Sequence, residues 1–146
     1  MQRKHEIEIV TTVDVADLEE GRLIDLANWI LNDEKCPALW RIAIIFVDDR
    51  FISELNIKFL QKSGPTDVIS FNLSDSESEP DGEIYISVET ASRNAKDYNV
   101  ELTNELYRLA AHGLYHLLDY GDADPQQRRE MTRLENKALE YIESTL

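Results

Sequence analysis

The sequence predicts an α+β fold with mixed α/β layers, in which a small sheet of about four strands packs with about five helices. Short runs rich in β-branched residues, typical of strands, lie among longer segments whose apolar residues recur every three or four positions, as in amphipathic helices. The chain also shows no internal repeat and no obvious linker. Its 146 residues are most simply one domain, covering residues 1–146.

The strand signals are alternation and β-branched content. The first segment alternates through Ile7 and Ile9, and the second is a continuous apolar run that indicates a buried strand. Strands are expected at residues 5–13, 42–47, 67–73 and 83–86. Residues 74–82 read SDSESEPDG, which is acidic, rich in serine and without apolar anchors, so we expect a mobile loop there.

The helix signals are periodic apolar positions together with capping residues and breakers. The clearest helix is expected at residues 101–118, and the last at residues 127–142 with Asp124 as its N-cap. Three further helices are expected: one capped by Asp17 and ending before Pro37, one begun by Asp48 and Asp49 and broken at Gly64-Pro65, and one capped by Ser87 and reaching Tyr98.

Composition limits the possible environments and partners. The net charge of −14 repels RNA on average, so a nucleic-acid role requires a local basic cleft. A single cysteine, Cys36, cannot form an intrachain disulfide, which favours a reducing, cytoplasmic location. No stretch approaches the ~20 apolar residues of a membrane span, and the first residues lack the apolar run of a signal peptide, so no membrane partner is expected.

The strongest functional signal is the pair His112 and His116, four residues apart in a predicted helix. Side chains at this spacing project from one helical face, one turn above the other, so two ring nitrogens can bind one divalent ion. Asp122 lies just beyond the expected end of the helix and can fold back as a third ligand. Three protein ligands leave the fourth zinc position open for water, as in catalytic sites.

The spacing leaves the third ligand open. Asp119 falls on the same helical face as the histidines, Asp122 follows a glycine that lets the chain turn back, and Asp124 is also near. The metallopeptidase pattern H-E-x-x-H is absent, because Gly113 stands where its general-base Glu would be. An ordinary metallopeptidase helix is therefore excluded. Gly113 also indicates close backbone packing beside the histidines, since glycine costs about 1 kcal/mol inside a helix.

Three ordered blocks of the chain resemble the YbeY endoribonuclease family. Residues 112–124, HGLYHLLDYGDAD, resemble its signature His-Gly-x-x-His-Leu-x-Gly-Tyr-Asp-His, and the matching positions are His112, Gly113, His116, Leu117 and Tyr120. Leu55-Asn56 followed by residues 65–71, PTDVISF, is similar to the family's L-N…P-T-D-V-L-S-F. Residues 82–87, GEIYIS, are similar to its G-D-I-x-I-S. The resemblance covers nearly the whole chain.

The resemblance implies a zinc-dependent, single-strand-specific endoribonuclease that acts in ribosomal RNA maturation, at the 3′ end of the small-subunit RNA, and in ribosome quality control. It implies one zinc ion per chain, held by His112, His116 and Asp122. It also implies ribosomal RNA, small ribosomal subunit proteins and an assembly GTPase as partners. Asp122 stands where the family usually has its third histidine. The site would therefore carry a net charge of +1 rather than +2, which weakens the metal as a Lewis acid.

A second departure from the family lies at Leu60, where the family usually carries an arginine thought to help with the phosphate. Lys58 and Lys62 are near in sequence and could substitute in part, although lysine is a point charge and not a bidentate fork. RNA binding is expected to involve Lys58, Lys62 and Arg93, although a solvated surface charge is the more common explanation for each of them alone.

Asp67 and His112 are the expected catalytic residues. His112 acts through the metal, and Asp67 acts as a base or as the carboxylate that orients a metal-bound histidine. A cap at a strand end explains Asp67 equally well. Two other functions stay open. A zinc hydrolase on a small ester, amide or phosphate would show acidic cleft walls and no basic rim, and a ribosome-associated binding protein with structural zinc would show four protein ligands.

Overall fold

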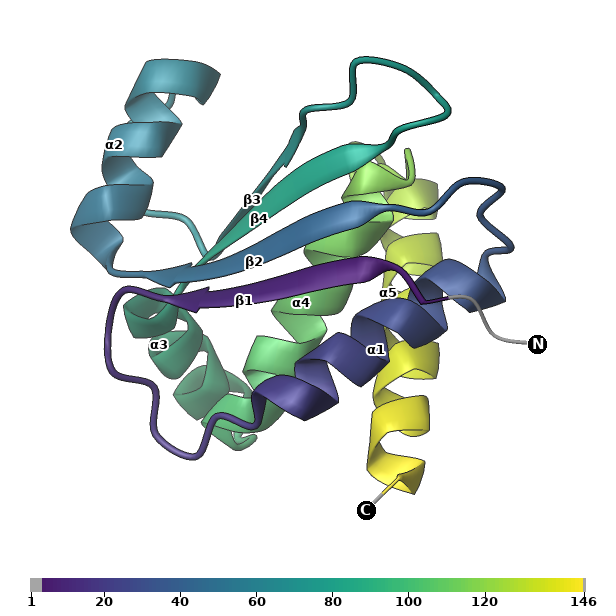
Figure 1. Cartoon of the computed structure of the whole chain (residues 1–146). Helices are drawn as coiled ribbons and strands as arrows, with labels where there is room; N and C mark the ends of the chain where they lie inside the picture. The colour runs from purple at the N-terminus through teal and green to yellow at the C-terminus, as the bar shows by residue number, and fades with distance from the viewer. Residues whose placement is uncertain (1–3, 146) are drawn as a thin grey trace.

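The computed structural model describes residues 4–145, which form four strands and five helices (Figure 1). The strands are β1 (Glu6–Thr11), β2 (Arg41–Val47), β3 (Val68–Asn72) and β4 (Asp81–Ser87). The helices are α1 (Glu20–Asp33), α2 (Asp49–Leu60), α3 (Val88–Tyr98), α4 (Leu102–Leu117) and α5 (Pro125–Ser144). The α+β class predicted from the sequence is confirmed, and the predicted elements agree with the observed ones to within a few residues at each end.

The four strands form one mixed sheet in the order β1-β2-β4-β3. Strands β1, β2 and β4 run parallel to one another, and β3 pairs antiparallel with β4. The central strands β2 and β4 carry alternating residues that point into the main core, among them Ile42, Ile44 and Ile84. The edge strand β3 follows the end of α2 and pairs Ile69 with Tyr85 of β4.

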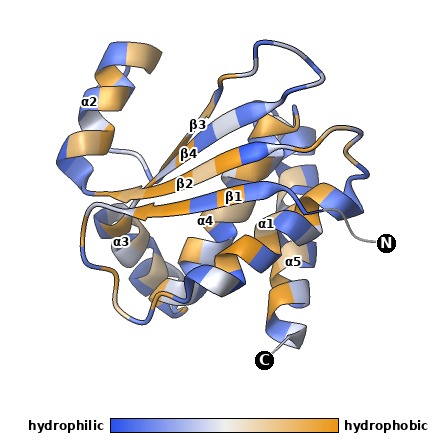
Figure 2. Cartoon of the chain, viewed as in Figure 1, coloured by the Kyte–Doolittle hydropathy of each residue, from blue (hydrophilic) through white to orange (hydrophobic). Residues whose placement is uncertain are grey.

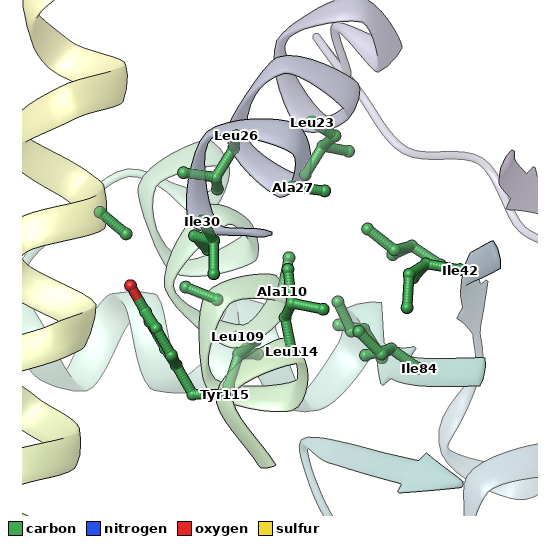
Figure 3. Close-up of a cluster of buried hydrophobic side chains, with 14 of the residues drawn as sticks. Leu23, Leu26, Ala27, Ile30, Ile42, Ile84, Leu109, Ala110, Leu114 and Tyr115 are labelled. Carbon is green, nitrogen blue, oxygen red and sulfur yellow. The ribbon is translucent and has the colours of Figure 1, made fainter. Parts of the chain in front are cut away.

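The main core lies between one face of the sheet and helices α1 and α4, as Figure 3 shows. In that view α1 contributes Leu23 and Ile30, β2 contributes Ile42, and α4 contributes Leu114 and Tyr115. Helix α5 packs outside α4 and adds Met131, Leu134 and Ala138 to the same core. Helix α4 is therefore sandwiched between the sheet and α5, so side chains on its flanks reach both neighbours.

Helix α2 covers the other side of the sheet, and among the helices its start contacts α3 (Figure 1). A small second cluster forms where Ile52 of α2 meets Val47 and Ile69. Hydrophobic residues continue along α2 (Figure 2), and Ile57 and Phe59 stay more than half exposed. The end of α2 and the chain that follows it lead directly into β3 beside α4.

The capping predictions are confirmed in three places and wrong in one. The side chains of Asp48, Ser87 and Asp124 accept backbone N–H groups at the starts of α2, α3 and α5. Asp17 is not a cap: it adopts a left-handed conformation with φ of 59°, and the N-cap of α1 is Glu19. A left-handed residue cannot lead directly into a helix, so α1 begins later than the Asp17 signal predicts.

Helix α2 ends before the breaker that the sequence singles out. Gln61 takes a left-handed conformation with φ of 55°, and the N–H of Lys62 bonds to the carbonyl of Asn56. The helix therefore stops at Leu60 by a local C-cap, ahead of Gly64-Pro65.

The segment between β3 and β4 is a loop, as predicted, although β4 starts at Asp81 and takes over its last two residues. A short bridge between Ser76 and Glu79 tightens this loop. Its mobility stays a prediction. Within residues 4–145, no helix has both the length and the apolar character needed to cross a membrane.

Candidate metal centre

Helix α4 places His112 and His116 on one face, as their spacing predicts. Their ring centroids lie 4.5 Å apart, and the two Nε2 atoms are separated by 3.0 Å. Gly113 lets the helix approach the sheet closely, since a Cβ at this position would lie 2.6 Å from Cγ2 of Ile84 and 3.0 Å from Oγ of Ser70. The Ser70 hydroxyl also donates to the Gly113 carbonyl at 2.8 Å. The predicted close packing at Gly113 is confirmed, and it fixes the histidines relative to β3 and β4.

Asp122 completes a cluster of three potential ligands. The chain turns back after α4, so that Oδ2 of Asp122 lies 3.5 Å from Nε2 of His112 and 3.3 Å from Nε2 of His116. Ligand atoms held about 2.0–2.1 Å from a tetrahedral zinc ion lie roughly 3.3 Å from one another. The three observed separations, 3.0, 3.3 and 3.5 Å, fit that requirement.

The other two aspartates near the end of α4 do not join this cluster. Asp124 caps α5 by accepting the N–H of Gln127, as predicted. Asp119 adopts a left-handed conformation with φ of 72° and is not among the described residues whose ligand atoms converge. In residues 4–145 the converging set consists of His112, His116 and Asp122. The side chains of the histidines are partly buried, whereas that of Asp122 is 48% exposed, so the cluster opens to solvent on the aspartate side.

Glu135 of α5 is the carboxylate that contacts His112. Its Oε2 lies 2.6 Å from Nδ1 of His112, and the Glu135 residue is only 5% exposed. In the tautomer that carries its proton on Nδ1, the Nδ1–H group of His112 donates to Glu135. The lone pair of Nε2 is then free for an ion. Sequence reasoning missed this residue, although one signal was available. Glu135 falls between Leu134 and Ala138 on the buried side of α5, where a charge needs a partner.

Glu135 is itself held in place by Arg108 of α4. Nη1 of Arg108 donates to Oε1 of Glu135 at 3.1 Å, and the same guanidinium donates twice to the buried Glu105, at 2.8 and 2.5 Å. The hydrogen bonds to Glu105, together with the charges of both carboxylates, raise the pKa of Arg108 above its ordinary value despite burial. Three buried or half-buried charges thus satisfy one another directly behind His112.

Asp67 lies at the entry to β3 and contacts neither histidine ring through a hydrogen bond of its own. Its Oδ2 accepts the side-chain amide of Asn94 at 3.1 Å, and the same amide nitrogen donates to Glu105 at 3.2 Å. The carboxylate that orients His112 is therefore Glu135, and Asp67 is linked to that group only through Asn94 and Glu105. A direct catalytic part for Asp67 stays a prediction.

A recess of about 420 Å³ opens beside His116. It is lined by Leu60, the last residue of α2, and by Lys62 just after it. Ser70 of β3 and Asp119 also line the recess. Asn72, Leu117 and Asp119 also line a larger groove of about 720 Å³, which runs toward Trp40 and the loop at Ser74–Glu77. The recess beside His116 and this groove are therefore adjacent, and Asp75, Glu77 and Asp119 make the groove acidic.

The three residues predicted to bind RNA lie in different places. Lys62 lines the recess, and Lys58 is exposed on α2 with its ammonium group 5.3 Å from the Phe59 ring centroid. Arg93 instead pairs with Asp49 at 2.8 Å. Burial opposes ionisation of Asp49, but hydrogen bonds from Ser87, Thr90 and Arg93 and the charge of Arg93 hold its pKa below the usual value. Arg93 thus anchors α2 to α3, and the structure does not bring it to the recess.

An α+β sheet fold in which two histidines and one aspartate converge beside an open recess defines a candidate metallohydrolase. Residues 8–143 match the family model described as Endoribonuclease YbeY, so the chain belongs to the YbeY endoribonuclease family. This membership confirms the resemblance inferred from the three sequence blocks. The family is one of nucleases, and hence of hydrolases.

Curated relatives are similar over most of their length. The chain is 37% identical over 131 residues to the endoribonuclease YbeY of Chloroherpeton thalassium, covering 90% of this chain and 92% of that protein. It is 38% identical over 114 residues to that of Amoebophilus asiaticus, covering 76% and 77%. The solution structure of TM1509 from Thermotoga maritima superposes with a TM-score of 0.66 at 28% identity, covering 93% of this chain and 88% of that one. These similarities extend over most of the described fold.

Proposed function

We propose that this chain is a zinc-dependent, single-strand-specific endoribonuclease that acts in ribosomal RNA maturation, at the 3′ end of the small-subunit RNA, and in ribosome quality control. The observation that carries the proposal is the convergence of His112, His116 and Asp122 beside a recess lined by Lys62, in a member of an endoribonuclease family. In this proposal residues 1–146 act as one domain in the cytoplasm, with small ribosomal subunit proteins and an assembly GTPase as partners.

Each residue of the centre has a definite task in the proposal. His112, His116 and Asp122 hold one zinc ion, and the ion when bound polarises a phosphoryl oxygen or lowers the pKa of its water toward ~7. Glu135 keeps the Nδ1 proton of His112 in place, so that Nε2 faces the ion. Lys62 attracts the RNA backbone into the recess.

The remaining predicted residues take more distant parts. We assign Asp67 a positioning role, because Asn94 links it to Glu105, and Glu105 holds the arginine that contacts Glu135. Lys58 contributes on the exposed face of α2, outside the recess. Arg93 is proposed to contact RNA only near the start of α2, where it pairs with Asp49.

The two rival functions have less support. A hydrolase for small substrates would have acidic cleft walls without a basic rim. Asp119 lines the recess and Asp75 and Glu77 line the adjoining groove, but Lys62 supplies a cation beside His116. A structural zinc site would close the metal sphere with four protein ligands, whereas three ligand groups converge in residues 4–145.

The metal assignment is tested by measuring zinc per chain in the native protein purified without chelator and in three single variants. We expect one zinc per chain, lost in His116→Ala and in Asp122→Ala and retained in the matched control Asp119→Ala. Removing one of three ligands destroys the site, whereas Asp119 lies outside the converging set. Absence of zinc from the native chain, even after zinc is added back, would contradict the proposal that the protein is a metalloenzyme.

The RNA assignment needs a separate assay with the zinc-loaded protein. We expect cleavage of a single-stranded fragment from the 3′ end of small-subunit precursor RNA, and little cleavage of the same fragment annealed to its complement. In His116→Ala, which is expected to lose its zinc, RNA cleavage should be lost as well. A zinc-loaded chain that leaves both RNAs intact but hydrolyses a phenyl phosphate ester would instead support the rival hydrolase.

A further inference from the structure

Arg128 of α5 contacts the turn that carries Asp122 and is not among the residues that line the recess. It lies in the first turn of α5, just after the cap Asp124. Its Nη1 donates to the main-chain oxygen of Asp122 at 3.3 Å. Since the Asp122 carboxylate lies 3.3 Å from His116, this contact places a guanidinium beside the ligand cluster. Sequence reasoning missed it, because Arg128 matches no motif.

The charge of Arg128 is not neutralised by an acidic side chain. In residues 4–145 every arginine except Arg128 and its neighbour Arg129 forms an ion pair with Asp or Glu; the paired ones are Arg22, Arg41, Arg50, Arg93, Arg108 and Arg133. In a chain with 29 acidic residues, an exposed arginine that stands at the candidate centre without such a partner is available to an anion.

The surroundings of Arg128 favour a phosphate over other anions. A guanidinium presents five N–H donors in a planar fork that matches two phosphate oxygens, and the contact to Asp122 occupies only part of it. From the end of α2 and the chain after it, the recess is lined by the apolar Leu60 and by Lys62, so Lys62 alone supplies positive charge there.

We propose that Arg128 binds a backbone phosphate of single-stranded RNA next to the metal centre, and so acts as the main phosphate-binding residue of this site together with Lys62. This inference rests on the proposed nuclease function. It adds the residue that compensates for the negative field of the chain, at a position supplied by the last helix and not by α2.

The direct test compares Arg128→Ala with the matched control Arg129→Ala in the zinc-loaded protein. Arg129 is also exposed and carries the same charge, but no contact ties it to Asp122. The probe is a short fluorescein-labelled single-stranded oligoribonucleotide, read by anisotropy and by cleavage rate. We expect Arg128→Ala to bind roughly tenfold more weakly, with a salt slope shallower by about 0.7, and Arg129→Ala to match the native chain. Equal effects of the two variants would overturn the proposal, because bulk charge would then explain both.

Two further variants separate phosphate binding from support of Asp122. Arg128→Gln keeps a donor for the Asp122 carbonyl without the charge, so we expect native zinc content with weakened RNA binding. Loss of zinc in Arg128→Gln would reassign Arg128 to the metal site and overturn the proposal. Adding Leu60→Arg to Arg128→Ala should restore part of the affinity, since position 60 lines the recess beside His116, where a new cation can meet another phosphate of the same strand. If the native zinc-loaded chain neither binds nor cleaves RNA, the proposed nuclease function itself is overturned. A native chain that cleaves RNA, with no effect of Arg128→Ala, overturns only the role of Arg128.

Discussion

Among single residues, Glu135 has the largest expected effect outside the three ligands. Its carboxylate lies 2.6 Å from Nδ1 of His112 and is 5% exposed, so it fixes both the tautomer and the ring orientation. We expect Glu135→Gln to lower zinc affinity roughly 10–100-fold, because the amide oxygen can still accept from Nδ1 but carries no charge. Competition with a chromophoric zinc chelator measures this change directly.

The matched control for Glu135 is Glu130 on the same helix. Glu130 pairs with Arg133 at the surface, away from both histidines. Glu130→Gln should leave zinc affinity unchanged, and thermal unfolding should show whether either variant is destabilised. Unchanged zinc affinity in Glu135→Gln, with native folding, would mean that the hydrogen bond to His112 does not tune the metal.

The residues differ in how far the sequence could predict them. The i, i+4 spacing of His112 and His116 on a helix determines their approach, and Asp122 lies within reach of any chain that turns back after α4. Glu135 and Arg128 could not be assigned in the same way. The apolar neighbours of Glu135 on α5 indicate that it is buried, but its partner His112 depends on how α4 and α5 pack. The contact of Arg128 with Asp122 depends on how the chain turns between these helices, which no local pattern encodes.

At the scale of elements, the contact between α4 and the sheet depends on Gly113. A Cβ there would meet Cγ2 of Ile84 at 2.6 Å, and Ile84 is a fully buried β-branched residue that cannot move away easily. We expect Gly113→Ala to lower the free energy of unfolding by about 1–2 kcal/mol, since overpacking exceeds the gain in helix propensity. The midpoint of urea unfolding, at unchanged m-value, reports this loss.

Gly21 provides the comparison for Gly113, because it also lies in a helix but a Cβ would meet nothing within 4 Å. Gly21→Ala should leave stability unchanged or raise it by about 0.4–1 kcal/mol. A Gly113→Ala protein as stable as the native chain would show that α4 can move outward. Its zinc affinity would then reveal whether the histidines move with the helix.

The presence of each helix and strand was more predictable than its first and last residues. Periodicity predicted the strands and helices because each buries one face, and caps with short polar side chains marked the starts of α2, α3 and α5. The errors arose where a non-glycine residue took a left-handed conformation. Asp17 and Gln61 both do so, and the sequence offers no glycine at either place to signal it.

On the scale of the whole molecule, the net charge of −14 conflicts with an RNA substrate unless positive charge is local. The structure suggests how the conflict is reduced. Most described arginines are paired with acids, whereas Lys62 lines the recess beside His116 and Arg128 contacts the main chain of Asp122. Such a distribution could not be predicted from composition, which averages over the surface. It follows from topology, which brings the end of α2 and the start of α5 to the same end of α4.

This distribution predicts an unusually weak salt dependence of RNA binding. Each phosphate neutralised on a single strand contributes about −0.7 to the slope of log K against log salt concentration, so two contacts give roughly −1.4. We expect the zinc-loaded chain to show a slope no steeper than this, measured by anisotropy of a labelled single-stranded oligoribonucleotide over a range of potassium chloride. Salt also screens the repulsion between the acidic surface and RNA, which flattens the slope further. A much steeper slope would mean that RNA follows a longer basic track than Lys62 and Arg128 provide. The bound RNA would then have to extend over the exposed face of α2, which carries the exposed Lys58.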